Sequence, residues 1–256
     1  MFDINRILKV TSSKKDVYVD EADFERCLSE SLRDSGYKVT NQKSFQCEDF
    51  HNSRNIIPDI IVEHGGTTIV MLELKYVIIS LESKLVTHTR NHDLPAFSYD
   101  ILKDCAKAES LIKKGVVKDS RIIALTNVRK VWEGRGPKGW SFYFGQAIRD
   151  DVGAKIQGLI KTSSINRNDE AAIDKAIFNQ HRYHIFLEYE WTVEWLDYSQ
   201  VKCKQGNGKL RALVLTPNLK KSTLERRLEK DLDSKTVPFI SESAKNRALD
   251  LKGTIS

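Results

Sequence analysis

The strongest constraint on the fold of this chain is a predicted β-hairpin between residues 56 and 76. Residues 56–62 and 67–76 are rich in β-branched side chains, and the pair Gly65-Gly66 separates them. Two such runs around a Gly-Gly pair predict an antiparallel hairpin with a tight turn. The hairpin would place the start of its first strand beside the end of its second.

Charged residues lie at that end of both predicted strands. Asp59 opens the first strand, and Glu73 and Lys75 lie near the end of the second. Because side chains alternate along a strand, Glu73 and Lys75 should share one face, with Leu74 on the other. Two carboxylates and one ammonium group would then meet at one edge of a small sheet. Burying unpaired charge is costly, so this arrangement indicates a functional role.

A helix is predicted at residues 20–35, before the hairpin. Phe24, Leu28 and Leu32 recur every four residues and form an apolar stripe. Asp20 is a suitable N-cap and Gly36 a suitable residue after the C-cap. Glu25 borders the stripe, so we expect it to lean toward the edge of the sheet, although Glu21 or Glu30 could take that place.

The remaining segments predict a mixed α/β sheet. Up to residue 127 the order is helix, three strands, helix and strand, which is typical of such a fold. The further expected elements are a strand at 37–40, helices at 96–114, 146–161, 168–182 and 241–250, strands at 121–127, 185–196 and 210–215, a helix beginning at the capping box 222–225, and loops at 46–55, 81–95 and 132–145.

We expect three parts along the chain. Residues 1–19 would form an N-terminal arm or short helix, residues 20–130 the core, and residues 131–256 a C-terminal α+β elaboration of strands and basic helices packed on that core. No internal repeat or low-complexity segment is present.

Charge and composition favour a nucleic-acid partner. The formal net charge is +6 and the pI is near 9.0, which favours polyanions. From residue 200 onward there are 13 Lys and Arg against 6 Asp and Glu. The four cysteines lack metal-ligand spacing, and no run approaches the ~20 apolar residues of a membrane span. The expected location is cytoplasmic, with no membrane partner.

The charged hairpin residues resemble the PD-(D/E)XK nuclease superfamily. Pro58-Asp59, thirteen intervening residues and Glu73-Leu74-Lys75 match its motif. Phe24-Glu25, the leucines that follow and Gly36-Tyr37 are similar to the first helix of Mrr-type members. The resemblance covers about residues 20–128. It implies a restriction-endonuclease-like core, with a mixed central sheet flanked by helices.

The resemblance also implies roles for individual residues. Asp59, Glu73 and the Leu74 backbone carbonyl would bind Mg²⁺, or Mn²⁺ in its place, and Glu25 would bind through water or recruit a second ion. Lys75 would position and help deprotonate the attacking water, or stabilise charge on the phosphate. A hard cation bound by carboxylates suits the cleavage of an anionic phosphodiester. The products would carry 5′-phosphate and 3′-hydroxyl ends.

Structural explanations exist for each of these residues. Asp59 could be a turn acid, Glu73 and Lys75 a solvated strand face, and Glu25 a surface acid of its helix. Four basic residues are weaker candidates for nucleic-acid contacts, with a solvated helix face or a hairpin tip as the alternative: Lys103, Lys107, Arg135 and Lys138.

The sequence thus predicts a Mg²⁺-dependent endodeoxyribonuclease with a restriction, phage-defence, mobile-element or repair role. DNA is the expected partner, and RNA is not excluded. A homodimer or a larger nuclease complex would suit cutting of both strands, and the stripe Leu224, Leu228 and Leu232 could serve as its interface. The alternatives are a non-cleaving nucleic-acid-binding or assembly subunit with the same fold, and a ribonuclease.

Overall fold

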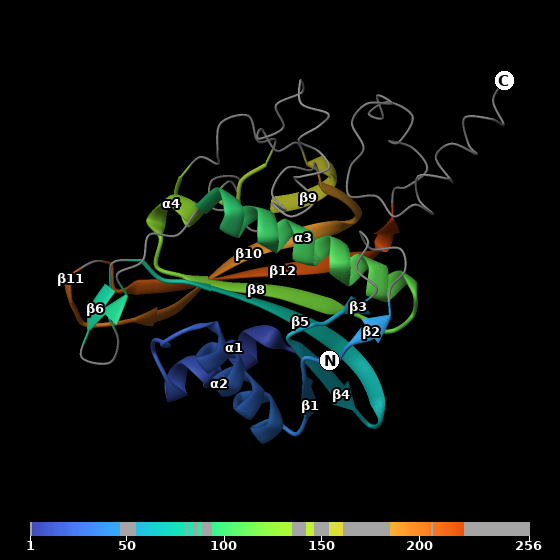
Figure 1. Ribbon diagram of the computed structural model, residues 1–256, viewed down its shortest axis with the longest axis horizontal. Helices are drawn as coiled ribbons and strands as arrows, with labels where there is room; N and C mark the ends of the chain where they lie inside the picture. Colours follow the sequence, from blue (N-terminus) through green and yellow to red (C-terminus); the bar gives the residue numbers. More distant parts are fainter. Residues whose placement is uncertain are drawn as a thin grey trace.

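The computed structural model is an α/β fold built on a seven-stranded mixed sheet, with strand order β1-β4-β5-β8-β12-β10-β9 (Figure 1). β5 and β8 are parallel, and every other neighbouring pair is antiparallel. The predicted mixed α/β sheet flanked by helices is therefore confirmed. The structure describes residues 2–46, 55–79, 81–83, 87–88, 94–134, 142–145, 154–160, 185–205 and 207–222.

The sheet strands and helices have the following bounds. The helices are α1 (Ile4–Lys14), α2 (Glu21–Asp34), α3 (Leu94–Lys113) and α4 (Arg129–Trp132). The strands of the large sheet are β1 (Lys38–Asn41), β4 (Ile60–His64), β5 (Thr67–Val77), β8 (Ser120–Thr126), β9 (Ala154–Ile160), β10 (Ile185–Gln200) and β12 (Lys209–Ser222). Two small sheets contain β2 (Phe45–Gln46) with β3 (Asn55–Ile56), and β11 (Cys203–Gln205) with β6 (Leu81–Ser83) and β7 (Thr87–His88).

The predicted hairpin is confirmed as β4 and β5. Gly65 and Gly66 have φ angles of +59° and +77°, a conformation that glycine adopts without strain. His64 pairs with Thr67 across this two-residue turn, and Ile60 pairs with Leu72. The turn sets the pairing of the residues next to it, and a register shift between Val62 and Glu63 sets the pairing of the rest of the hairpin.

Helix α2 is confirmed with both of its predicted caps. The Asp20 side chain accepts a hydrogen bond from the Asp23 backbone N–H at 2.8 Å. At the other end Gly36 has φ of +87°, and the Tyr37 N–H donates to the Leu32 carbonyl at 3.1 Å. The stripe of Phe24, Leu28 and Leu32 is fully buried against the sheet.

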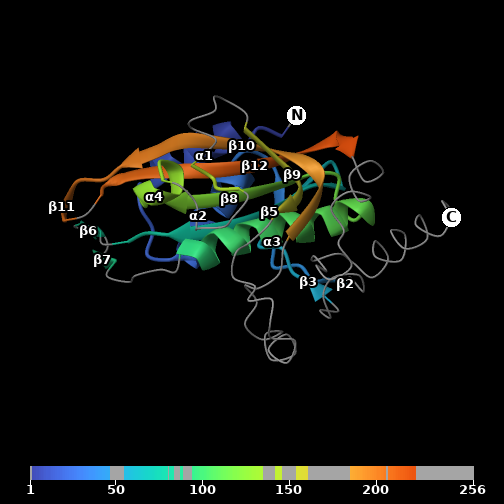
Figure 2. The same cartoon turned by 90° about the horizontal axis from the view of Figure 1, so that it is seen from above.

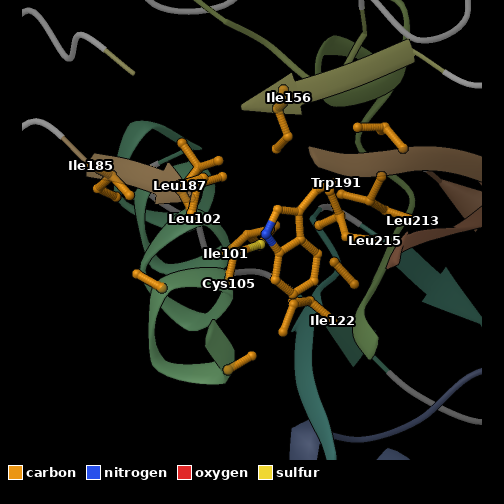
Figure 3. Close-up of a cluster of buried hydrophobic side chains, with 14 of the residues drawn as sticks. Ile101, Leu102, Cys105, Ile122, Ile156, Ile185, Leu187, Trp191, Leu213 and Leu215 are labelled. Atoms are coloured by element: carbon orange, nitrogen blue, oxygen red, sulfur yellow. The ribbon is translucent and has the colours of Figure 1, made fainter. Parts of the chain in front are cut away.

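Helices cover both faces of the sheet. α1 and α2 lie on one face and α3 on the other (Figures 1 and 2). On the α3 face, the Trp191 side chain of β10 points toward Cys105 of α3 and is fully buried (Figure 3). Burial of such an aromatic side chain in a continuous cluster fixes α3 against the C-terminal strands.

The helix predicted at 146–161 is wrong where the structure describes it, because residues 154–160 form strand β9. Ile156 and Ile160 are four residues apart, a spacing that suits a helix and a strand equally. Both are buried, and β9 pairs with the open edge of β10. Pairing with β10, which is distant in the sequence, makes this segment a strand and not a helix.

Two other segments differ from expectation. Part of the predicted loop 81–95 forms the short strands β6 and β7, since β6 pairs with β11 from far along the chain. β12 pairs directly with β8, so the described C-terminal strands continue the central sheet. The expected helices at 168–182 and 241–250 and the stripe Leu224, Leu228 and Leu232 lie outside the described residues. The same holds for the helix expected from the capping box 222–225, except for Ser222, which is the last residue of strand β12. Within the part of the chain that the structure describes, no helix has the length and apolarity to cross a membrane.

Candidate active site

The candidate site forms where β5 runs past the beginning of β4. Pairing between the two strands stops at Ile60 and Leu72, whereas β5 continues beside β8 to Val77. Beyond Leu72, backbone N–H groups on the β4 side of β5 therefore lack a strand partner. A buried N–H without an acceptor is costly, so this edge needs acceptors from elsewhere.

Two carboxylates supply those acceptors. The Leu74 N–H donates to Asp59 Oδ2 at 2.6 Å, and the Tyr76 N–H donates to Glu21 Oε2 at 2.9 Å. Asp59 comes from the turn that leads into β4, and Glu21 from the first turn of α2. The end of β5 thus holds two acids that would otherwise repel each other.

Glu73 and Lys75 share the face of β5 that α3 covers, as predicted. Leu74 lies on the opposite face, in the core under α1 and α2. The Glu73 side chain is only 2% exposed. Lys75 Nζ donates to the Leu74 carbonyl at 2.9 Å, which keeps its ammonium group at the end of the strand.

Asp104 of α3 contacts this group of charged residues from the face of the sheet that α3 covers. Its side chain is 2% exposed, and its Oδ2 lies 2.8 Å from Lys75 Nζ. Its Oδ1 accepts a hydrogen bond from Lys107 Nζ, one helical turn later. Sequence reasoning assigned no role to Asp104. A signal was present, because an acid at position 104 interrupts the apolar stripe of the helix between Ile101 and Cys105.

The electrostatics of the site disfavour the ionised carboxylates. Burial raises the pKa of Glu73 well above its usual range, and the charges of Asp104 and Asp59 add to the shift. Burial likewise raises the pKa of Asp59, although the Leu74 N–H and Lys75 oppose it. The pKa of Glu21 is also raised, chiefly by burial. A further cation would stabilise all three in their charged form.

The pKa of Lys75 is shifted in the direction that keeps its side chain charged. Burial alone would lower the pKa of its ammonium group, but the charges of Asp104 and Glu21 outweigh burial and raise it. Lys75 is therefore a cation over the whole physiological pH range. In this arrangement it can donate hydrogen bonds and stabilise negative charge.

The oxygen atoms of the site are of the type that binds a hard divalent cation, but few side chains supply them. Glu73 Oε1 is buried and accepts no hydrogen bond from any described residue, and Lys107 Nζ lies 4.0 Å away. An uncompensated buried acceptor of this kind fits a cation ligand. Asp59 and the Leu74 carbonyl are the other nearby oxygen donors. Among the described residues, no set of three or more His, Cys, Asp or Glu side chains is arranged to hold a metal ion.

The other predicted residues are dispersed. Glu25 does not join the cluster, because its carboxylate accepts from Asn41 Nδ2 of β1 at 2.6 Å, and Glu21 stands at the site one helical turn earlier. Lys107 is part of the cluster. Lys103 is half-buried on α3, and burial, followed by the charge of Lys107, lowers its pKa.

Arg135 and Lys138 lie outside the described residues. The structure therefore brings together Asp59, Glu73, Lys75 and Lys107, adds Glu21 and Asp104, and leaves Glu25 on the β1 edge. No known protein-family model, curated protein or solved structure matches this chain.

Proposed function

We propose that this protein is a metal-dependent nuclease with a restriction-endonuclease-like core of the PD-(D/E)XK type. The observation that carries the proposal is the meeting of Asp59, Glu73 and Lys75 at the end of β5, with Glu73 buried and one of its oxygens without a hydrogen bond. Burying such a carboxylate costs free energy, and buried acids of this kind cluster at active sites.

In this proposal Asp59, Glu73 and the Leu74 carbonyl would hold Mg²⁺, or Mn²⁺ in its place. The bound ion would supply Lewis-acid stabilisation of the phosphate and a more acidic water. The Leu74 N–H keeps Asp59 oriented, and α3 excludes bulk water from Glu73. Lys75, held as a cation, orients the attacking water or donates to a phosphate oxygen. In-line attack at phosphorus would leave 5′-phosphate and 3′-hydroxyl ends.

Nucleic acid is the proposed substrate because the chain has an excess of basic residues, and DNA is the form that the resemblance to PD-(D/E)XK nucleases implies. The test is incubation of the purified protein with plasmid, single-stranded DNA and RNA, in Mg²⁺, Mn²⁺ or chelator. Asp59→Asn and Lys75→Ala serve as site variants, and Glu30→Gln, an exposed acid of α2, as the matched control. Metal-dependent cutting by the wild type and the control, lost in both site variants, supports the proposal. Cutting of RNA alone would assign a ribonuclease, and cutting that survives both site substitutions would refute the site.

A second candidate is a non-cleaving nucleic-acid-binding or assembly subunit with the same fold. The ion pairing of Lys75 to Asp104 favours it, because this contact directs the ammonium group toward α3. In that case the protein binds nucleic acid with a steep salt dependence and cuts none of the three substrates.

A further inference from the structure

We propose that Asp104 is a positioning residue of the candidate active site that directs Lys75 beside Glu73, while its second carboxylate oxygen binds Lys107. The inference rests on the proposed nuclease function and gives a role to an acid of α3, the helix that covers Glu73 and Lys75.

The contacts of Asp104 join the two elements. One carboxylate oxygen lies 2.8 Å from Lys75 Nζ of β5, and the other accepts from Lys107 Nζ of α3. Lys107 Nζ is in turn 4.0 Å from Glu73 Oε1. A single carboxylate thus fixes both cations on the side of Glu73 that faces α3.

Burial makes Asp104 a permanent partner and leaves the lysines partly accessible. The side chain of Asp104 is 2% exposed, against 20% for Lys75 and 23% for Lys107. An incoming phosphate can therefore approach the ammonium groups but cannot replace their counter-ion. Asp104 itself does not touch the substrate in this arrangement.

The ammonium group of Lys75 retains capacity for a substrate. A lysine carries three N–H donors. The Leu74 carbonyl accepts one of them, and Asp104 Oδ2 lies 2.8 Å from Nζ as an ion-pair partner; no other acceptor for Lys75 occurs among the residues whose placement the structure gives. Donor capacity is left for a water or phosphate oxygen, and the ion pair with Asp104 determines its direction.

A double-mutant cycle on cleavage tests this role. Single-turnover rates are measured for the wild type, Asp104→Asn, Lys75→Ala and the double variant, with Asp100→Asn, one turn earlier on α3, as the matched control. Loss of a residue that orients a catalytic group costs about 10- to 100-fold. We expect Asp104→Asn to lower the maximal rate by that factor with little change in KM, and Asp100→Asn to leave it unchanged.

The Lys75→Ala background distinguishes positioning from a structural role. If Asp104 acts through Lys75, Asp104→Asn changes the rate by less than about twofold in that background. If its loss instead multiplies with that of Lys75→Ala, Asp104 does not act through Lys75 and the inference is overturned.

Asp104→Glu covers the case in which Asp104→Asn fails to fold. It keeps the charge and moves the carboxylate by one methylene, so we expect a reduced rate in the wild-type background and no further loss in the Lys75→Ala background. Equal losses in both backgrounds would overturn the inference. A wild-type protein that cuts nothing would instead reject the proposed function, and the inference with it.

Discussion

Glu73→Gln should make the protein more stable while it abolishes cleavage. Glu73 is 2% exposed, and its Oε1 accepts no hydrogen bond from a described residue. An unsatisfied buried polar group costs about 1–3 kcal/mol, more when it is charged. The amide of glutamine is still polar, but it removes the buried charge and its repulsion with Asp104 and Asp59, which outweigh the lost attraction to Lys107. The free energy of unfolding should therefore rise near pH 8 by about 1–3 kcal/mol, the order of the extra cost of an uncompensated buried charge.

The gain must depend on pH in a defined direction. Burial and neighbouring acids raise the pKa of Glu73 in the folded state, so the folded protein binds a proton more tightly than the unfolded chain does. Wild-type stability therefore falls as pH increases from the unfolded pKa to the raised folded pKa. Glu73→Gln lacks this fall. The two proteins should have similar stability below about pH 4 and diverge above it.

Thermal unfolding in the presence of chelator, from pH 4 to pH 8, measures this difference. For a chain of this size 1 kcal/mol corresponds to about 2–4 °C in Tm. Glu30→Gln, on the exposed face of α2, is the control and should shift Tm little at any pH. A Glu73→Gln protein that is less stable than the wild type at pH 8 would show that Glu73 stabilises the fold, and would refute the reasoning.

Two further predictions follow from the contacts around the site and the core. Glu21→Gln should lower cleavage by about 10- to 100-fold, because Glu21 accepts the Tyr76 N–H and supports the end of β5. Glu25→Gln should lower cleavage less, because Glu25 binds Asn41 away from the site; equal losses in a cleavage assay would contradict this assignment. Glu109 of α3 accepts hydrogen bonds from the Trp191 Nε1–H at 2.8 Å and from two backbone N–H groups of β10. Glu109→Leu removes this acceptor and should lower the free energy of unfolding by about 3 kcal/mol. Urea unfolding measures the change, and an unchanged midpoint would contradict the prediction.

The local features of the fold were readable from the sequence. The Gly65-Gly66 turn, the caps of α2 and the alternation along β5 depend on neighbouring residues, and each is confirmed. Strand β9 could not be predicted, because the spacing of Ile156 and Ile160 suits a helix as well as a strand. Pairing with β10 determines that this segment is a strand. For the same reason the insertion of β12 beside β8 could not be foreseen.

The candidate site was predictable in part. Asp59, Glu73 and Lys75 belong to one hairpin, so strand geometry brings them together. The contributions of Asp104 and Glu21 depend on how α3 and α2 dock on the sheet, which a single sequence does not specify. Glu25 and Glu21 are one turn apart on α2, and the exact rotation of the helix determines which acid reaches β5.

The most direct test of the central claim is the binding of a divalent cation at Asp59 and Glu73. Isothermal titration of Mn²⁺ into the wild type, Asp59→Asn, Glu73→Gln and the Glu30→Gln control measures it without any substrate. We predict binding by the wild type and the control that is lost in both site variants, with cleavage lost in the same two proteins. Equal Mn²⁺ affinity in all four proteins would contradict the assignment of this site.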